Sequence, residues 1–128
     1  MEKLTILKNR YGDFCDSIIE CLSYKLHYNN RIIEMTTLTR NIEFTDKNVY
    51  EIVKFRFTKI KEFKFYEEKG SVNYVVVLGG NFLKIENTYI FDFIPWGENL
   101  TTLGDIRKSD FYIICEEFDF EFKQYFDV

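Results

Sequence analysis

Hydrophobic and polar residues alternate along much of this chain, a pattern typical of β-strands with one buried and one exposed face. The alternation is clearest from Val49 to Phe65. The run from Asp110 to Phe126 is apolar on both faces through Cys115 and alternates after it. A single unbroken strand over 49–65 would be unusually long, so we expect a break or a β-bulge between Thr58 and Lys61. The pattern therefore predicts a fold built mainly from strands.

The stretch from Ser17 to Arg40 contains two β-rich runs separated by Asn29 and Asn30. Asparagine tolerates the positive φ that a tight hairpin turn requires, so the pattern predicts a hairpin closed by a two-residue loop. Two cross-strand pairs define the predicted register: Leu26 opposite Ile33 and Lys25 opposite Glu34.

The first strand of this hairpin has an alternative. Ser17 and Glu20 form a capping-box pattern, and apolar residues recur at helical spacing from Phe14 to Leu26, which is typical of a helix. We favour the strand, because a matching β-rich run follows the asparagine pair directly.

The rest of the chain divides into short apolar runs separated by turns. Leu4 and Ile6 alternate like a short strand that leads into a turn. The other predicted elements are a turn at 67–71, a three-stranded meander over 72–78, 82–86 and 89–94, a long loop at 98–105 and a final strand over 110–126. We therefore predict one all-β domain over residues 1–128, an antiparallel sandwich or closed barrel of seven to eight strands with room for one short N-terminal helix.

Composition agrees with this fold class. The 128 residues include 14 Phe, 9 Tyr and a single Pro, with no Ala, so residues that suit a pleated sheet dominate. No window approaches the roughly 18 apolar residues of a transmembrane helix, and the first apolar run is too short for a signal peptide. The three cysteines lack metal-ligand spacing and fit a reducing compartment, which predicts a cytoplasmic protein with no membrane partner.

Charge is unevenly distributed along the chain. The net charge is −4, but residues 1–69 hold 13 Lys and Arg against 11 Asp and Glu, whereas residues 70–128 hold 4 against 10. The second part could present an acidic surface to a basic partner. The alternative is that the excess acidity only keeps the protein in solution.

The basic run from Lys54 to Lys64 interleaves cations with aromatic residues, as in proteins that bind single-stranded nucleic acids. Alternation places its phenylalanines on the face opposite its cations, so we expect no nucleic-acid binding. His27 is the only histidine, and no nucleophile–base pair, metal-ligand set or phosphate-binding loop is recognisable. We expect no enzymatic activity, no metal and no cofactor.

Two groups of acidic residues are candidates for contact with a partner. Glu117, Asp119 and Glu121 alternate near the C-terminus and would share one exposed face. The same residues could instead protect a sheet edge from pairing with another chain. Asp13 and Asp16, at the entrance to the hairpin, form the second group, although acids at a strand entrance often serve turns or caps.

Two short motifs carry a resemblance to a known family. Phe14-Cys15-Asp16-Ser17 resembles the aromatic-His-Asp-Ser entry into the first hairpin of small bacterial immunity proteins of polymorphic toxin systems, with Cys15 in the place of the histidine. Ser109-Asp110-Phe111-Tyr112-Ile113 resembles the closing strand of the same proteins. The resemblance implies a binding protein that masks a toxin and uses no cofactor.

The leading hypothesis is therefore a non-enzymatic immunity protein that neutralises a basic cognate toxin by occlusion. Complementary charge would raise the association rate and the specificity of such a complex. The alternatives are a β-barrel whose aromatic residues line a cavity for a small apolar ligand, and a structural or interaction domain.

Overall fold

The computed structural model of the chain describes residues 2–67 and 75–125. Within these residues it contains two helices and seven strands, and their bounds follow in chain order: α1 (Lys3–Tyr11), β1 (Ser17–His27), β2 (Asn30–Arg40), β3 (Tyr50–Phe65), β4 (Val75–Val77), β5 (Asn81–Ile85), β6 (Thr88–Asp92), α2 (Leu103–Ile106) and β7 (Phe111–Gln124).

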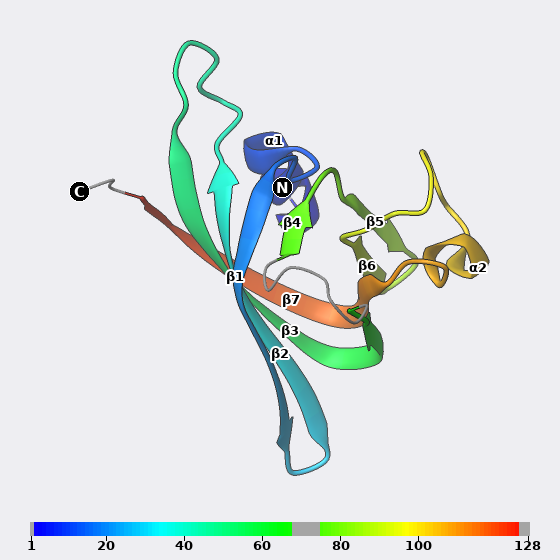
Figure 1. Cartoon of the computed structure of the whole chain (residues 1–128). Coiled ribbons are helices and arrows are strands. Elements are labelled where there is room, and N and C mark those ends of the chain that lie inside the picture. The colour runs from blue at the N-terminus through cyan, green and yellow to red at the C-terminus, as the bar shows by residue number, and fades with distance from the viewer. Residues whose placement is uncertain (1, 68–74, 126–128) are drawn as a thin grey trace.

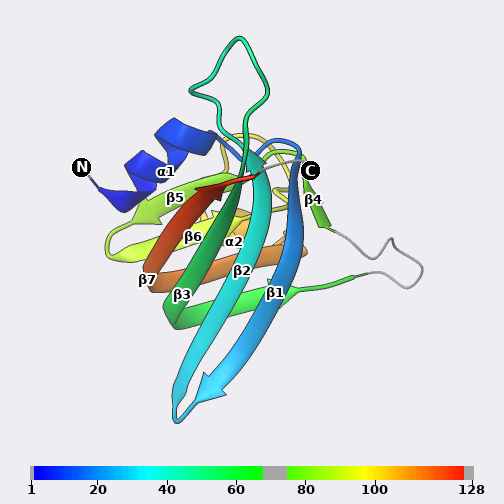
Figure 2. The same ribbon diagram turned by 90° about the vertical axis from the view of Figure 1, so that its left-hand side faces the viewer.

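All seven strands belong to one sheet, in the order β4-β1-β2-β3-β7-β6-β5, and every neighbouring pair is antiparallel. The sheet is curled into a half-barrel, and α1 lies beside β5 (Figures 1 and 2). This confirms the predicted all-β, antiparallel fold of seven strands. A short N-terminal helix is present, but it lies at Lys3–Tyr11, and the segment from Ser17 for which a helix was the alternative is a strand.

Aromatic rings fill the inner face of the curled sheet. Phe57 and Phe91 are almost completely buried, and their ring centroids lie 5.0 Å apart in an edge-to-face arrangement. Helix α1 contributes Leu4 and Leu7 to the same core. A smaller core, which includes Ile106 of α2, covers the opposite face of β6 and β7. The early part of β7 is therefore buried on both faces, as its continuous apolar run predicted.

The N-terminal segment is a helix, so the short strand predicted around Leu4 and Ile6 is wrong. Leu4, Leu7 and Tyr11 are buried, whereas Ile6 is exposed, which is helical rather than alternating burial. Gly12 ends the helix with φ 63°, and its N–H donates to the carbonyl of Lys8 over 2.8 Å.

The predicted hairpin is confirmed as β1 and β2, but its predicted register is wrong by two residues. Tyr28 and Asn29 form the turn, so Leu26 pairs with Arg31 instead of Ile33. A shift of two residues keeps every side chain on the same face, and hydrophobic alternation cannot detect it. Lys25 now lies diagonal to Glu34, and the two still form an ion pair of 3.3 Å.

Strand β3 contains the predicted irregularity. Its register with β7 shifts between Ile60 and Glu62, and Lys59 takes a φ of 50°. This β-bulge bends the long strand and keeps apolar side chains on the inner face on both sides of the bend.

The predicted three-stranded meander is wrong in one strand. Strands β5 and β6 pair as predicted, but β4 lies at the other edge of the sheet, where it pairs with β1. Val77 of β4 is fully buried at that edge, and its carbonyl accepts the N–H of Asp16. Burial of Val77 therefore favours β1 as the partner of β4. Leu78, the last residue of the strand predicted at 72–78, is exposed, and residues 72–74 of that strand lie outside the described residues.

Two further predictions concern loops. The long loop predicted at 98–105 contains the start of α2, because the hydroxyl of Thr102 caps the helix by accepting from the N–H of Asp105 over 3.2 Å. The turn predicted at 67–71 lies mostly outside the described residues.

Replacement of Phe91 by alanine tests the importance of the aromatic core. The ring packs against Phe57 and Phe118, and its removal is expected to lower the free energy of unfolding by about 3–5 kcal/mol. Urea unfolding followed by circular dichroism measures the change. Tyr66→Ala, at a residue that is 57% exposed, is the control and should change stability little.

Candidate functional site

The predicted acidic group lies on the outer face of β7. Glu117, Asp119 and Glu121 are all exposed and share this face. Strand β3 places Lys54 directly opposite Glu121 and Arg56 directly opposite Asp119. The structure therefore brings the three acids together, as predicted, and interleaves them with cations that the sequence analysis did not associate with them.

Only part of this charge is neutralised within the protein. Glu117 forms an ion pair of 2.8 Å with Lys59, and Asp119 forms one with Lys3 of α1. Lys54, Arg56 and Glu121, at the centre of this face, have no ion-pair partner among the residues that the structure describes.

The unpaired charges line a groove. It has a volume of about 420 Å³, and its lining residues come from β2, β3 and β7: Glu34, Lys54, Phe55, Arg56, Asp119, Phe120 and Glu121. A smaller hollow of about 170 Å³ shares Lys54 and Glu121 with it. We call the larger one the charged groove. It offers both signs of charge to a ligand or partner.

The second predicted acidic group lies elsewhere, on the turn between α1 and β1. Asp13 lines an open hollow of about 570 Å³ together with residues of the β4–β5 and β6–α2 connections. Its carboxylate accepts the N–H of Cys15 over 3.1 Å, which is a turn-forming role. Asp16 is exposed, with a φ of 62°. The structure gives these two acids a local structural role and leaves their contact with a partner as a prediction.

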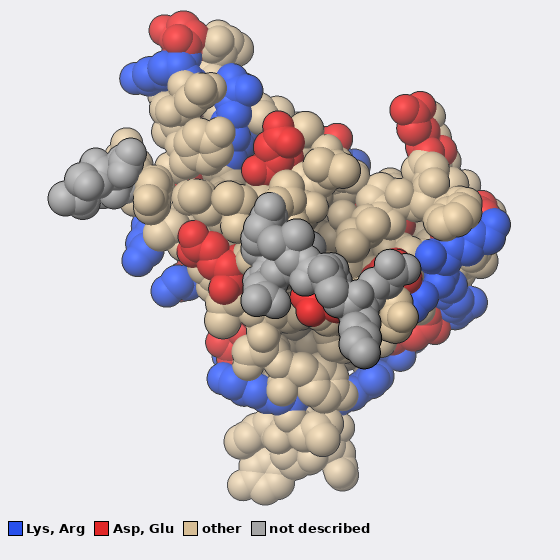
Figure 3. All heavy atoms as spheres, in the orientation of Figure 1, with Lys and Arg blue, Asp and Glu red and all other residues tan. Residues whose placement is uncertain are grey.

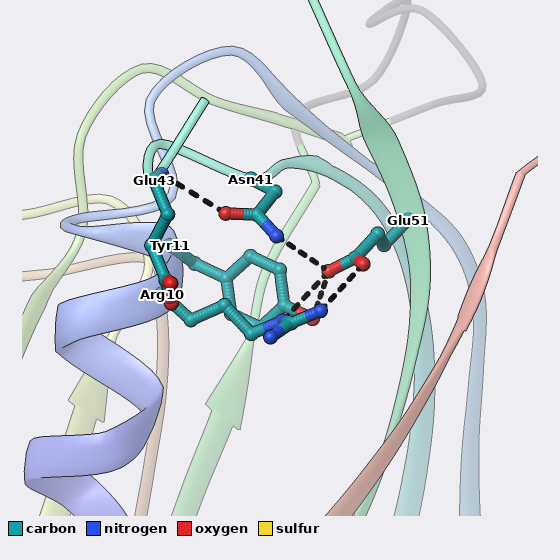
Figure 4. A network of polar contacts seen from close by, with 5 residues as sticks. All are labelled: Arg10, Tyr11, Asn41, Glu43 and Glu51. Atoms are coloured by element: carbon teal, nitrogen blue, oxygen red, sulfur yellow. Dashed lines mark hydrogen bonds and ion pairs between the residues drawn. The ribbon is translucent and has the colours of Figure 1, made fainter. Parts of the chain in front are cut away.

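A buried polar network was missed by sequence reasoning (Figure 4). The guanidinium of Arg10 donates to both carboxylate oxygens of Glu51, over 2.8 and 2.7 Å, and the hydroxyl of Tyr11 donates to Oε1 over 2.8 Å. Asn41 donates to the same oxygen over 3.3 Å. Burial acts to raise the pKa of Glu51, but the hydrogen bonds from Arg10 and Tyr11 outweigh it and hold that pKa below its ordinary value.

This network joins distant segments of the chain. It connects the end of α1 to β3 and to the connection between β2 and β3, where the N–H of Ile42 donates to the carbonyl of Arg10 over 2.9 Å. The Arg10 guanidinium also lies 3.8 Å from the ring centroid of Phe122 in β7. All polar partners are used internally, so we assign the network to stability.

Asp92 is a second buried acid that the sequence did not reveal. Its side chain is completely buried, and Oδ2 has no hydrogen-bond partner among the described residues. Oδ1 accepts the N–H of Ile94 over 3.2 Å. Burial raises the pKa of Asp92, against the opposing effects of the nearby Ser109 side chain and of the N–H of Ile94.

The end of the β1–β2 hairpin is an exposed apolar surface. Leu26 is 72% exposed and Tyr28 is 90% exposed, while Tyr24 is 44% exposed and stacks on Phe63. Figure 3 shows this end as a projection without Lys, Arg, Asp or Glu on the visible face. We call Tyr24, Leu26 and Tyr28 the hairpin tip. The alternation of large apolar residues up to the turn was the signal in the sequence.

The remaining reactive side chains are dispersed. His27 packs edge to face on Tyr28, with 4.7 Å between ring centroids. Cys15 and Cys21 are exposed, whereas burial raises the pKa of the Cys115 thiol to about 12. Over residues 2–67 and 75–125, no three His, Cys, Asp or Glu side chains are placed to hold a metal ion. The described helices are all too short to cross a membrane.

Comparisons with protein-family models, with curated proteins and with solved structures found no match for this chain. In the structure, the first motif of the proposed resemblance places Phe14 in the core and Ser17 at the buried start of β1. In the second motif, Phe111, Tyr112 and Ile113 form the buried start of β7. The resemblance to immunity proteins stays a prediction.

Replacement of Glu51 by glutamine tests the buried network. The loss of charge is expected to lower the free energy of unfolding at pH 7 by about 1–3 kcal/mol. Because the folded pKa of Glu51 is lowered, its stabilisation is complete above the unfolded value of about 4.5 and disappears as the pH falls through the folded pKa. In urea unfolding at several pH values, the difference from wild type should therefore shrink progressively as the pH falls below about 4.5. Glu43→Gln, at an exposed residue, is the matched control.

Replacement of Asp92 by asparagine is expected to raise the free energy of unfolding at pH 7, whereas Glu51→Gln lowers it. A raised folded pKa means that stability falls as the pH rises above the unfolded value of about 3.8. The neutral amide keeps the acceptor for Ile94 and is expected to raise the free energy of unfolding at pH 7 by about 1–2 kcal/mol. Thermal unfolding at pH 7 and pH 3 measures the gain, which should vanish at the lower pH. A variant less stable than wild type at pH 7 would contradict this account, and Asp46→Asn is the exposed control.

Proposed function

We propose that this protein is a protein-binding module, and that it acts as an immunity protein that neutralises a cognate toxin by occluding it. The proposal gives it no catalytic step and no cofactor. The motifs at 14–17 and 109–113 support the family. The two exposed free thiols, Cys15 and Cys21, agree with action in the cytoplasm.

The charged groove is the observation that carries the proposal. Lys54, Arg56 and Glu121 line it without ion-pair partners among the described residues. Charges that remain unpaired within a protein are free to pair with complementary charges of another protein. Glu34 and Asp119 lie directly across the strands on either side of Arg56, so the groove offers a row of alternating sign.

Such a row favours specificity. A partner must match the order of charges, because like charges placed together cost several kcal/mol, roughly enough to exclude a mismatched surface. Glu117, Asp119 and Glu121 give the β7 side an acidic edge that would meet the basic surface of a toxin. Nucleic acid is a poorer partner, because these carboxylates would repel its phosphates.

The alternative of a small apolar ligand receives less support. It requires aromatic residues around a cavity, whereas Phe55, Phe57 and Phe91 pack against one another in the core. The hollows described above open on the surface, and charged or polar side chains make up much of their lining.

Charge reversal tests the site. Co-expression of the protein with the toxin encoded beside it should protect cells, and the triple variant E117K/D119K/E121K should lose protection, with binding weakened by about 100-fold or more. Growth of the co-expressing cells and calorimetry with an inactivated toxin provide the two measurements.

The matched control is E20K/E43K/E86K, which changes the net charge by the same amount at three exposed acids away from the groove. It should protect like wild type. Equal protection by both triple variants would exclude the acidic edge as the binding site, and wild-type protein that gives no protection would exclude the function itself.

A further inference from the structure

We infer that the hairpin tip is a rigid apolar anchor that inserts into an apolar pocket of the partner protein. The rim of that pocket carries charges of both signs. The inference rests on the proposed function and names a second contact, separate from the charged groove. The molecule that the tip contacts is a protein.

Exposure is the first argument. Leu26 and Tyr28 are 72% and 90% exposed, although a hairpin turn is usually built from small polar residues. Burial of their apolar surface in a partner would be favourable. Tyrosine is among the residues that contribute most to protein interfaces, because its large ring carries only a small entropic cost.

The tip is held in place at its base. Tyr24 stacks on Phe63 with 5.6 Å between centroids and 12° between ring planes. The guanidinium of Arg31 donates to the carbonyl of Ile60 over 2.6 Å, at the bulge of β3. These contacts join the hairpin to β3, so little freedom remains to be lost on binding.

The conformation of Tyr28 is a further argument. Its φ of 55° lies in the left-handed region that asparagine tolerates better than tyrosine, and an asparagine is the next residue. Strained residues of this kind cluster at binding sites, where an aromatic ring is retained at the expense of stability.

Charge around the tip favours a protein over an anionic membrane. Two cations near the hairpin base are paired with acids, Lys25 with Glu34 at 3.3 Å and Lys59 with Glu117 at 2.8 Å, and the guanidinium of Arg31 is bound to a backbone carbonyl. A bilayer surface would instead attract an excess of unpaired cations. Ion pairs around an apolar centre match a partner pocket whose rim also carries both signs.

The test uses the full-length protein and an inactivated form of the toxin that it neutralises. The variant L26S/Y28S is expected to weaken Kd by about 100-fold, because each side chain acts as a hot spot worth roughly tenfold. The matched control I94S/Y66S removes an aliphatic residue and a tyrosine of 43% and 57% exposure outside the hairpin, and should bind like wild type. Isothermal calorimetry measures both.

The variant Y28N separates binding from folding. Asparagine relieves the strain, so Tm should rise by about 3 °C while Kd weakens about tenfold. A variant that binds as tightly as wild type would overturn the anchor. If wild type binds the toxin and L26S/Y28S binds equally well, the anchor is wrong and the proposed function stands. If wild type forms no complex, both are wrong.

Two further measurements examine whether the tip binds a membrane or a second copy of the chain. Co-sedimentation with vesicles of phosphatidylcholine and phosphatidylglycerol should show no binding, and light scattering after gel filtration should give the same mass for wild type and L26S/Y28S. Vesicle binding that L26S/Y28S loses would assign the tip to a membrane and overturn the inference. A dimer that L26S/Y28S loses would assign it to a second copy of the chain, with the same consequence.

Discussion

The pairing of β3 with β7 is the interaction on which the rest of this structure depends. These two strands are the longest in the sheet and lie at its centre, with neighbours on both sides. Their register places Phe57 opposite Phe118 on the inner face and Arg56 opposite Asp119 on the outer face. The bulge near Lys59 bends the pair without exchanging these faces. One ladder thus creates both the aromatic core and the charged groove.

The two faces of this ladder obey different physical constraints. Aromatic rings on the inner face gain free energy by leaving water and by packing edge to face. Charges on the outer face stay solvated, and exposed ion pairs among them contribute little to stability. Residues of the outer face can therefore be substituted to suit a binding partner, whereas substitutions on the inner face would destabilise the fold. The buried Glu51 is the exception, because Arg10 and Tyr11 satisfy its carboxylate inside the protein.

The proposed binding surface has two unlike parts. The charged groove can set the specificity and the orientation of a partner, while the hairpin tip can supply apolar contact area. Both parts include contacts with β3. Its Arg56 lines the charged groove, and its Phe63 stacks on Tyr24 of the hairpin tip. A rigid central strand can hold them in a constant relation without any conformational change.

The sequence by itself determined the predominance of strands, the faces of β3 and β7, and the bulge, because alternation at a period of two is a local property. It also indicated that Glu117, Asp119 and Glu121 share a face. Tertiary structure alone decided the hairpin register, the partner of β4 and the neighbours of the buried Glu51 and Asp92. Those outcomes depend on contacts between residues far apart in the chain, and no local pattern records which distant surfaces will be buried together.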